Sequence, residues 1–213
     1  MKKISVFLVA FVSSLFVHVN AQTNYTSRIN NPGFETGNLT GWTFTGTSGF
    51  AWAGVNTDGD ATKTGSYIAG IWNSTIADVE LSQSLSGLPN GNYRVTADLM
   101  GSSNATTSRL TTQRLFANAK SKLFGLSTSY STANLGILGA TEGYSFGGYS
   151  ETANDKGPFL KLSVVVNVTD GNLKFGIRTN GKTSTLGYKF PNLTAGDGYG
   201  WFKVDNFTLT EVS

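Results

Sequence analysis

Short stretches in which apolar and polar residues alternate, separated by turn-forming residues, recur along this chain. The segment after the turn at Pro89-Asn90-Gly91 is the best example. Because successive side chains of a strand point to opposite faces, every second residue of this segment falls on one face. That face is wholly apolar: Tyr93, Val95, Ala97 and Leu99. A helix needs a period near 3.6, and this pattern does not supply it.

The same pattern predicts an all-β chain. Strands are expected at residues 42–45, 65–72, 79–85, 111–119, 159–168, 173–178 and 201–210. A helix is the alternative for 111–119. Two segments rich in Gly, Ser and Thr, 120–157 and 179–199, are expected to be long loops. Many short strands without helices indicate a two-sheet antiparallel β-sandwich, such as a jelly roll.

The first 21 residues are typical of a secretory signal peptide. Lys2 and Lys3 precede an apolar run at 4–19, and Val19-Asn20-Ala21 is a small-residue cleavage site. A retained membrane anchor is the alternative, although the apolar run is short for a span. We therefore expect a single domain at 22–213, secreted, periplasmic or on the cell surface. Without Cys, the lipoprotein form of this signal is excluded.

Histidine and cysteine are missing from the expected domain, because His18 is the only histidine and the chain has no Cys. This excludes Ser-His-Asp and Cys-His nucleophilic sites, zinc sites built on those residues, and disulfides. Without Lys2 and Lys3, basic residues exceed acidic ones by one. A nearly neutral chain with scattered charges argues against a nucleic-acid partner.

Two carboxylates stand near opposite ends of the expected domain. Glu35 lies in the segment NPGFETGNLTGW (31–42), and Asp205 lies in GWFKVDNFTLTEV (200–212). If the first and last strands lie side by side, these carboxylates meet, and they repel each other unless a cation holds them. The ion-free alternative is that Glu35 caps a turn and Asp205 accepts backbone hydrogen bonds.

Four motifs in this order resemble one family of proteins. They are NPGFETGNLTGW, LSQSLSGLPNGNYRVTADL (81–99), VTDGNLKFGIR (168–178) and WFKVDNFTL (201–209). Together they resemble the galactose-binding-like β-sandwiches, and among these the carbohydrate-binding modules related to families 4, 9 and 22. Such patterns are common in secreted proteins of Bacteroidetes. The resemblance covers most of 22–213, apart from the two expected loops.

The resemblance implies a structural calcium ion at the edge of the sandwich. By position, Glu35 and Asp205 would supply side-chain oxygens. Backbone carbonyls around Lys63 and Ser66, and Asn31, would complete the set. Such hard oxygen ligands suit calcium. The resemblance also implies that the Trp following Gly, Trp42, packs in the core, while strand alternation predicts the same for Phe34, Phe175 and Phe207.

A glycan ligand needs aromatic rings for the flat faces of its sugars and polar side chains for their edges. Our candidates are Trp52, Trp72, Tyr144, Tyr149, Tyr199 and Trp201, with Gln113 and Arg114 as polar partners. Each has a structural alternative. Trp72 ends an apolar strand and suits the core, and Trp201 suits a role in anchoring a loop.

Three functions stay open at this point. The first is a non-catalytic carbohydrate-binding module with a structural calcium. The second is an adhesion or structural protein that uses the same sandwich to bind a protein partner. The third is a glycoside hydrolase or lyase, for which Glu80, Asp98, Glu142 and Glu151 are available as carboxylates.

Overall fold

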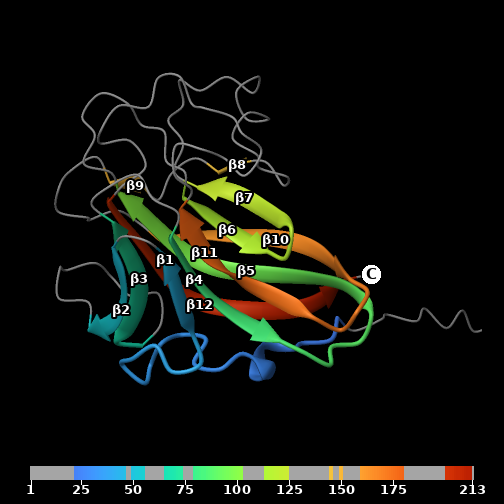
Figure 1. Ribbon diagram of the computed structural model, residues 1–213. Helices are drawn as coiled ribbons and strands as arrows, with labels where there is room; N and C mark the ends of the chain where they lie inside the picture. Colours follow the sequence, from blue (N-terminus) through green and yellow to red (C-terminus); the bar gives the residue numbers. More distant parts are fainter. Residues whose placement is uncertain are drawn as a thin grey trace, which may run out of the picture.

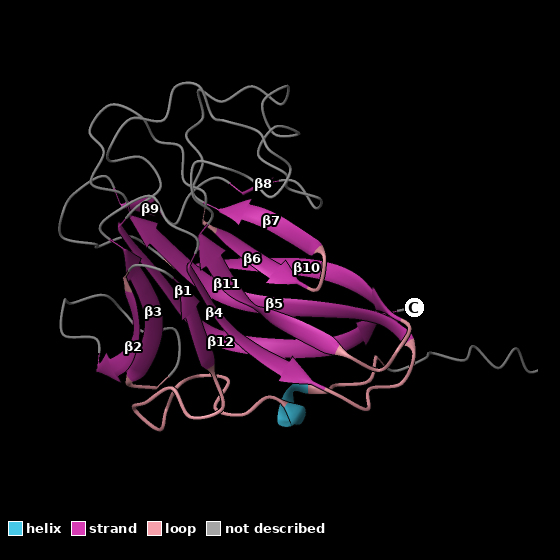
Figure 2. Ribbon diagram, viewed as in Figure 1, coloured by secondary structure: helices cyan, strands magenta, loops and turns pink. Residues whose placement is uncertain are grey.

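The computed structural model describes residues 22–46, 49–55, 65–73, 79–102, 113–124, 144–145, 149–150, 159–179 and 200–212. The expected signal peptide lies outside these ranges. Within them the chain forms one short 3-10 helix, η1 (Thr26–Arg28), and twelve strands (Figure 2). None of the helices in the described part of the chain is long and apolar enough to cross a membrane.

The strands build two sheets that pack against each other (Figure 1). We call the first the β4 sheet, with the order β1-β4-β11-β6-β7-β8, and the second the β5 sheet, with the order β10-β5-β12-β3-β2 and β9 beside β5. The β4 sheet contains β1 (Thr43–Gly46), β4 (Val79–Leu85), β6 (Arg114–Ala117), β7 (Lys120–Phe124), β8 (Tyr144–Ser145) and β11 (Leu173–Thr179). The β5 sheet contains β2 (Phe50–Val55), β3 (Tyr67–Asn73), β5 (Gly91–Ser102), β9 (Tyr149–Ser150), β10 (Leu160–Val168) and β12 (Gly200–Val212).

All of these pairings are antiparallel except those of the two-residue strands β8 and β9. The predicted all-β, two-sheet antiparallel sandwich is confirmed. Residues 114–117 form a strand, so the helical alternative for 111–119 is wrong.

The core lies between the two sheets and follows the predicted alternation. Tyr93, Val95, Ala97 and Leu99 of β5 are all fully buried in it. A cluster of aromatic rings closes one end of the core. The ring of Trp42 lies 4.7 Å from Phe207, 5.2 Å from Phe34 and 5.7 Å from Phe175, measured between centroids. The four rings that we expected in the core are therefore buried there.

The chain ends are joined differently from our expectation. The first strand, β1, pairs with β4 and not with the last strand. Instead, the segment before it, residues 23–32, runs along β12. The amide of Tyr25 donates to the carbonyl of Leu209 (2.8 Å), and that of Phe207 donates to the carbonyl of Pro32 (2.9 Å). Hydrogen bonds of this irregular segment, and not of a strand, bring the two ends together.

The sequence patterns did not predict every strand. β2 was not predicted, and β7 begins at Lys120, inside the segment 120–157 that we expected to be a loop. The short strands β8 and β9 lie in the same segment. β2 pairs with β3, the next strand along the chain, and β7 pairs with β6, the strand before it. Alternation within β2 and within β7 is too short to predict either strand.

Tyr93 links the β5 hairpin to the N-terminal segment. Its hydroxyl donates a hydrogen bond to the carbonyl of Pro89 at 2.8 Å, across the turn that precedes the strand. Its ring and that of Tyr25 form a T-shaped pair with a centroid distance of 5.4 Å. Burial, with a smaller contribution from Tyr25, raises the pKa of the Tyr93 hydroxyl to about 12.

We predict that Tyr93→Phe lowers the free energy of unfolding by about 1 kcal/mol at neutral pH, because one buried hydrogen bond is lost. In the wild type, the folded pKa of about 12 exceeds the reference value of 10.0. The unfolded chain therefore releases the proton first, and stability falls as the pH rises from 10 to 12. In Tyr93→Phe this part of the fall disappears.

Urea unfolding at neutral pH and in the alkaline range measures both effects. Tyr67→Phe is the control, since it removes the hydroxyl of a half-buried tyrosine. Equal alkaline losses in the wild type and in Tyr93→Phe would contradict the prediction.

Candidate functional site

Aromatic side chains gather on the outer face of the β5 sheet, at β2 and β3. Ala51 and Ala53 of β2 pack against the core. Because side chains alternate along a strand, Phe50 and Trp52 belong to the opposite, outer face. The same holds for Trp72 of β3, since its neighbour Ile71 is part of the core.

These three rings form one surface, which we call the aromatic surface (Phe50, Trp52 and Trp72). Phe50 and Trp72 are opposite each other in the β2–β3 pairing, and their ring centroids are 5.5 Å apart. Trp52 is opposite Gly70 and lies over it: a side chain at Gly70 would begin 3.2 Å from the indole nitrogen. Phe50 is 47% exposed, and both tryptophans are half-buried. The rings are thus held in place and still partly accessible.

A row of buried charged residues adjoins the aromatic surface on the same face. Lys203 of β12 pairs with Gly70, the residue beneath Trp52. Two residues further along β12 stands Asp205, directly opposite Asp98 of β5. Lys203, Asp205 and Asp98 are only 1%, 0% and 3% exposed.

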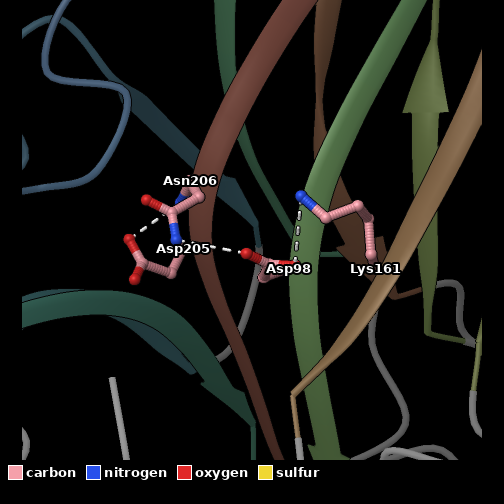
Figure 3. A network of polar contacts seen from close by, with 4 residues as sticks. All are labelled: Asp98, Lys161, Asp205 and Asn206. Atoms are coloured by element: carbon pink, nitrogen blue, oxygen red, sulfur yellow. Dashed lines mark hydrogen bonds and ion pairs between the residues drawn. The ribbon is translucent and has the colours of Figure 1, made fainter. Parts of the chain in front are cut away.

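Polar partners from the two strands beside β5 contact Asp98 (Figure 3). The side-chain amide of Asn206 donates to Oδ2 of Asp98 at 3.1 Å, and Nζ of Lys161 lies 3.7 Å from its Oδ1. The backbone amide of Asn206 donates to Oδ1 of Asp205 at 2.8 Å. Asn206 thereby bridges the two carboxylates, and Lys161 supplies a compensating charge from β10.

The structure places the predicted polar partners elsewhere. Arg114 begins β6 of the β4 sheet, and Gln113 directly precedes it. Because Leu115 belongs to the core, Arg114 lies on the outer face of that sheet. Arg114 is 4% exposed and stands opposite Arg178, whose guanidinium lies 4.7 Å from the ring of Phe116. The sandwich separates these residues from Trp52 and Trp72, which the sequence analysis had grouped with them.

The other predicted ligand residues are placed only in part. Tyr144 is in β8 of the β4 sheet, and Tyr149 is in β9 beside β5. Trp201 stands opposite Trp72 in the β3–β12 pairing. The side chains of these three, and Tyr199 altogether, lie outside what the structure describes. Phe50 was not predicted, because its role depends on its position opposite Trp72 in the β2–β3 pairing.

The residues proposed for calcium make contacts of their own. The carboxylate of Glu35 accepts the backbone amides of Ser66 at 3.2 Å and Tyr67 at 3.3 Å. The side chain of Asn31 accepts the amide of Thr36 and donates to the carbonyl of Asn38. These are contacts of the kind that the ion-free alternative predicts. Lys63 lies outside the described residues.

Side chains from both ends of the domain nevertheless converge beside Gly33. A side chain at Gly33 would begin 3.5 Å from Oδ1 of Asn206, 3.6 Å from Oδ1 of Asp205 and 3.9 Å from Cγ of Glu35. The carboxylate of Asp205 and the amide oxygen of Asn206 fit calcium in chemical type. The carboxylate oxygens of Glu35 accept the amides of Ser66 and Tyr67. Within the described ranges, no group of three or more His, Cys, Asp or Glu side chains is arranged to hold a metal. An ion here would therefore need amide and carbonyl oxygens as well.

Comparisons with known proteins gave matches only among solved structures. No family model and no curated protein matches this chain. The structure of TmCBM61 in complex with β-1,4-galactotriose is 18% identical, with a TM-score of 0.47, over 87% of this chain and 98% of that one. The K3 cleaved adhesin domain of Lys-gingipain from Porphyromonas gingivalis is 13% identical, with a TM-score of 0.43, over 89% and 99%.

The CBM22-1–GH10 modules of the Clostridium thermocellum xylanase 10B, solved with xylohexaose, are 12% identical with a TM-score of 0.44. This match covers 85% of this chain and 28% of that one. Carbohydrate-binding modules are thus among the structures to which this chain is similar, as the resemblance of its motifs led us to expect. At such low identities the likeness concerns the course of the backbone and decides nothing about the residues of a site.

Proposed function

We propose that this protein binds a glycan on the aromatic surface of the β5 sheet and does not turn it over. The observation that carries the proposal is the pair of neighbouring rings, Phe50 and Trp72, 5.5 Å apart, beside the indole of Trp52. A sugar ring presents a flat face of C–H groups, which stacks well on such rings. Rings on adjacent strands suit consecutive sugars of an oligosaccharide.

The way the rings are held favours binding. Trp52 lies against Gly70, and Trp72 packs on Phe50, so that these side chains lose little further freedom when a ligand binds. Exposure of Phe50 leaves apolar surface for a ligand to cover. Arg114 on the other sheet and Gln113 directly before it are, in contrast, both buried and less suited to direct contact.

We also propose that the bound glycan is not cleaved. Asp98 and Asp205 lie on the same face of the β5 sheet as the aromatic surface. Both are buried, and Asp98 is engaged by Lys161 and Asn206. An acid and a base of a glycosidase must reach the glycosidic bond from opposite sides. Buried carboxylates within a sheet are poorly placed for that.

We predict that Trp52→Ala weakens glycan binding by about tenfold or more, since a stacked ring contributes about 1 kcal/mol beyond the apolar area it buries. A glycan array first identifies the best ligand, and affinity electrophoresis or calorimetry with that ligand then compares the variants. Val55→Ala is the matched control. It removes apolar surface from the same strand, but its position in the alternation belongs to the other face.

Three results would contradict this function. Unchanged affinity in Trp52→Ala would place the glycan elsewhere. An array without hits, together with a specific protein recovered on the wild type but not on Trp52→Ala, would favour the adhesion function. Release of reducing sugar or of an unsaturated product from a polysaccharide panel would favour an enzyme.

We also propose that a calcium ion binds between the two chain ends, with Glu35, Asp205 and Asn206 among its ligands. The oxygen atoms of Asp205 and Asn206 beside Gly33, with Cγ of Glu35 next to them, support this proposal. The signal-like segment at 1–21 supports export of the chain to a compartment in which calcium is plentiful. When bound, the ion would neutralise the repulsion between the carboxylates and stabilise the fold.

We predict that calcium raises the melting temperature and that a chelator lowers it. At a concentration about 100 times the dissociation constant, binding adds about 2.7 kcal/mol to the stability. Asp205→Asn should lose most of this response, because one carboxylate is removed. Magnesium at the same concentration is the control, since it demands a smaller octahedral shell. Identical melting curves in calcium and in chelator would remove the ion, while the fold and the aromatic surface would stand.

A further inference from the structure

The strand β2 is the last strand of the β5 sheet on the side of β3 (Figure 1). A strand in this position offers hydrogen-bonding groups along its edge, and natural proteins usually protect such an edge with a charge, a proline or a bulge. β2 has none of these. Its sequence is Phe-Ala-Trp-Ala-Gly-Val, and all six residues pair in regular register with β3.

Exposed apolar surface is concentrated on the same strand. In the described part of the chain, the large hydrophobic side chains that are exposed are Phe50, at 47%, and Val55, at 54%, and both belong to β2. An uncharged edge strand with exposed apolar residues at both its ends is a surface that favours pairing with another strand.

The sequence of β2 is complementary to itself. Read in opposite directions, Trp52-Ala53-Gly54 places Trp against Gly, Ala against Ala and Gly against Trp. The protein already contains two of these three pairs, because Trp52 of β2 stands opposite Gly70 of β3 and Ala53 stands opposite Ala69, while Gly54 stands opposite Ile68. Trp52 lies over Gly70 there. A second copy of β2 can therefore pair with the outer edge of β2, much as β3 pairs with its inner edge.

The space for such a contact is present. Gly54 is on the same outer face as Trp52, and no described atom lies within 4 Å of the position that a side chain there would occupy. In an antiparallel pair, residues opposite each other share a face. The indole of Trp52 from a second copy would thus lie over Gly54, as Trp52 lies over Gly70 within one chain.

We propose that two copies of this protein associate through β2, antiparallel and in the register that sets Ala53 opposite Ala53 of the second copy. The two-fold axis then runs through this pair, perpendicular to the sheet, and each contact occurs twice. The two β5 sheets become one continuous sheet, and both aromatic surfaces face the same side. The association does not depend on the proposed function. If a glycan binds there, the pair would hold a polymer at two places and gain avidity.

Sedimentation velocity of the purified protein over a range of concentrations measures the association. A pairing of six-residue strands gives a small interface, so we expect a reversible monomer–dimer equilibrium. Gly54→Glu places a charge where the partner's indole would lie and should raise the dissociation constant by about tenfold or more. It has room in the single chain, so its circular dichroism and melting temperature should match the wild type.

Thr43→Glu is the matched control. It adds the same charge at an exposed position of β1, the edge strand of the other sheet, and should leave the equilibrium unchanged. A wild type that is monomeric at every concentration would overturn the proposal. So would a dimer that survives Gly54→Glu unchanged.

The register has a separate test, because the chain has no cysteine. Opposite residues of antiparallel strands have Cα atoms about 4.5–5.5 Å apart, within the span of a disulfide. Ala53→Cys should therefore yield a covalent dimer on mild oxidation, and Ala51→Cys, which faces Val55 of the partner, should yield much less. The reverse order would overturn this register. Since neither readout involves a glycan, failure of the pairing would be distinguishable from failure of glycan binding.

Discussion

The structure depends on a register shift in the last strand. β12 contributes Phe202 and Val204 to the core, and the pairing with β5 then shifts between Asp205 and Thr208. Without the shift, alternation would turn Phe207 to the outside. With it, Phe207 joins Trp42 and the neighbouring rings in the core. Asn206 stands in this irregularity with a φ of 52°, in the left-handed region that asparagine tolerates better than most residues.

The same irregularity organises the polar residues. The amide of Asn206 binds Asp205, and its side chain binds Asp98, so the shift is held by hydrogen bonds on the outer face while Phe207 holds it from the core. The carbonyl of Pro32 accepts the amide of Phe207, which fixes the N-terminal segment on β12. One local departure from regular pairing therefore fixes the chain ends, the end of the core and the oxygen atoms beside Gly33.

The aromatic surface and the edge strand are two properties of one hairpin-like pair, β2 and β3. A glycine in β3 makes the aromatic surface possible. Gly70 leaves room for the indole of Trp52 on the outer face, while Ala69 and Ile71 fill the core on the other side. Because β2 ends the sheet, its rings are less covered than those of the inner strands. The position of β2 at the end of the sheet therefore exposes its rings to a ligand and its edge to a second copy.

Local sequence patterns predicted much of the fold and only part of the candidate site. Val79–Leu85 was predicted with its observed bounds, and the buried face of β5 follows residue by residue from alternation. Trp52 and Trp72 were among the predicted ligand residues, but Phe50 was missed, since it is ordinary in sequence and matters only through its position opposite Trp72. Arg114 was grouped with the tryptophans, although the sandwich places it on the other sheet.

The amino-acid sequence by itself determined the class of fold, the turns and which face of each strand enters the core. These depend on side chains within a few residues of one another, where period two and turn chemistry leave few choices. Only the tertiary structure decided the order of strands in each sheet. That order places β2 at an edge and separates Arg114 from Trp52. The tertiary structure also brings Glu35 near Asp205, because the segment before β1 runs along β12. Pairing between distant strands is governed by the packing of the whole core, and no short stretch of sequence contains it.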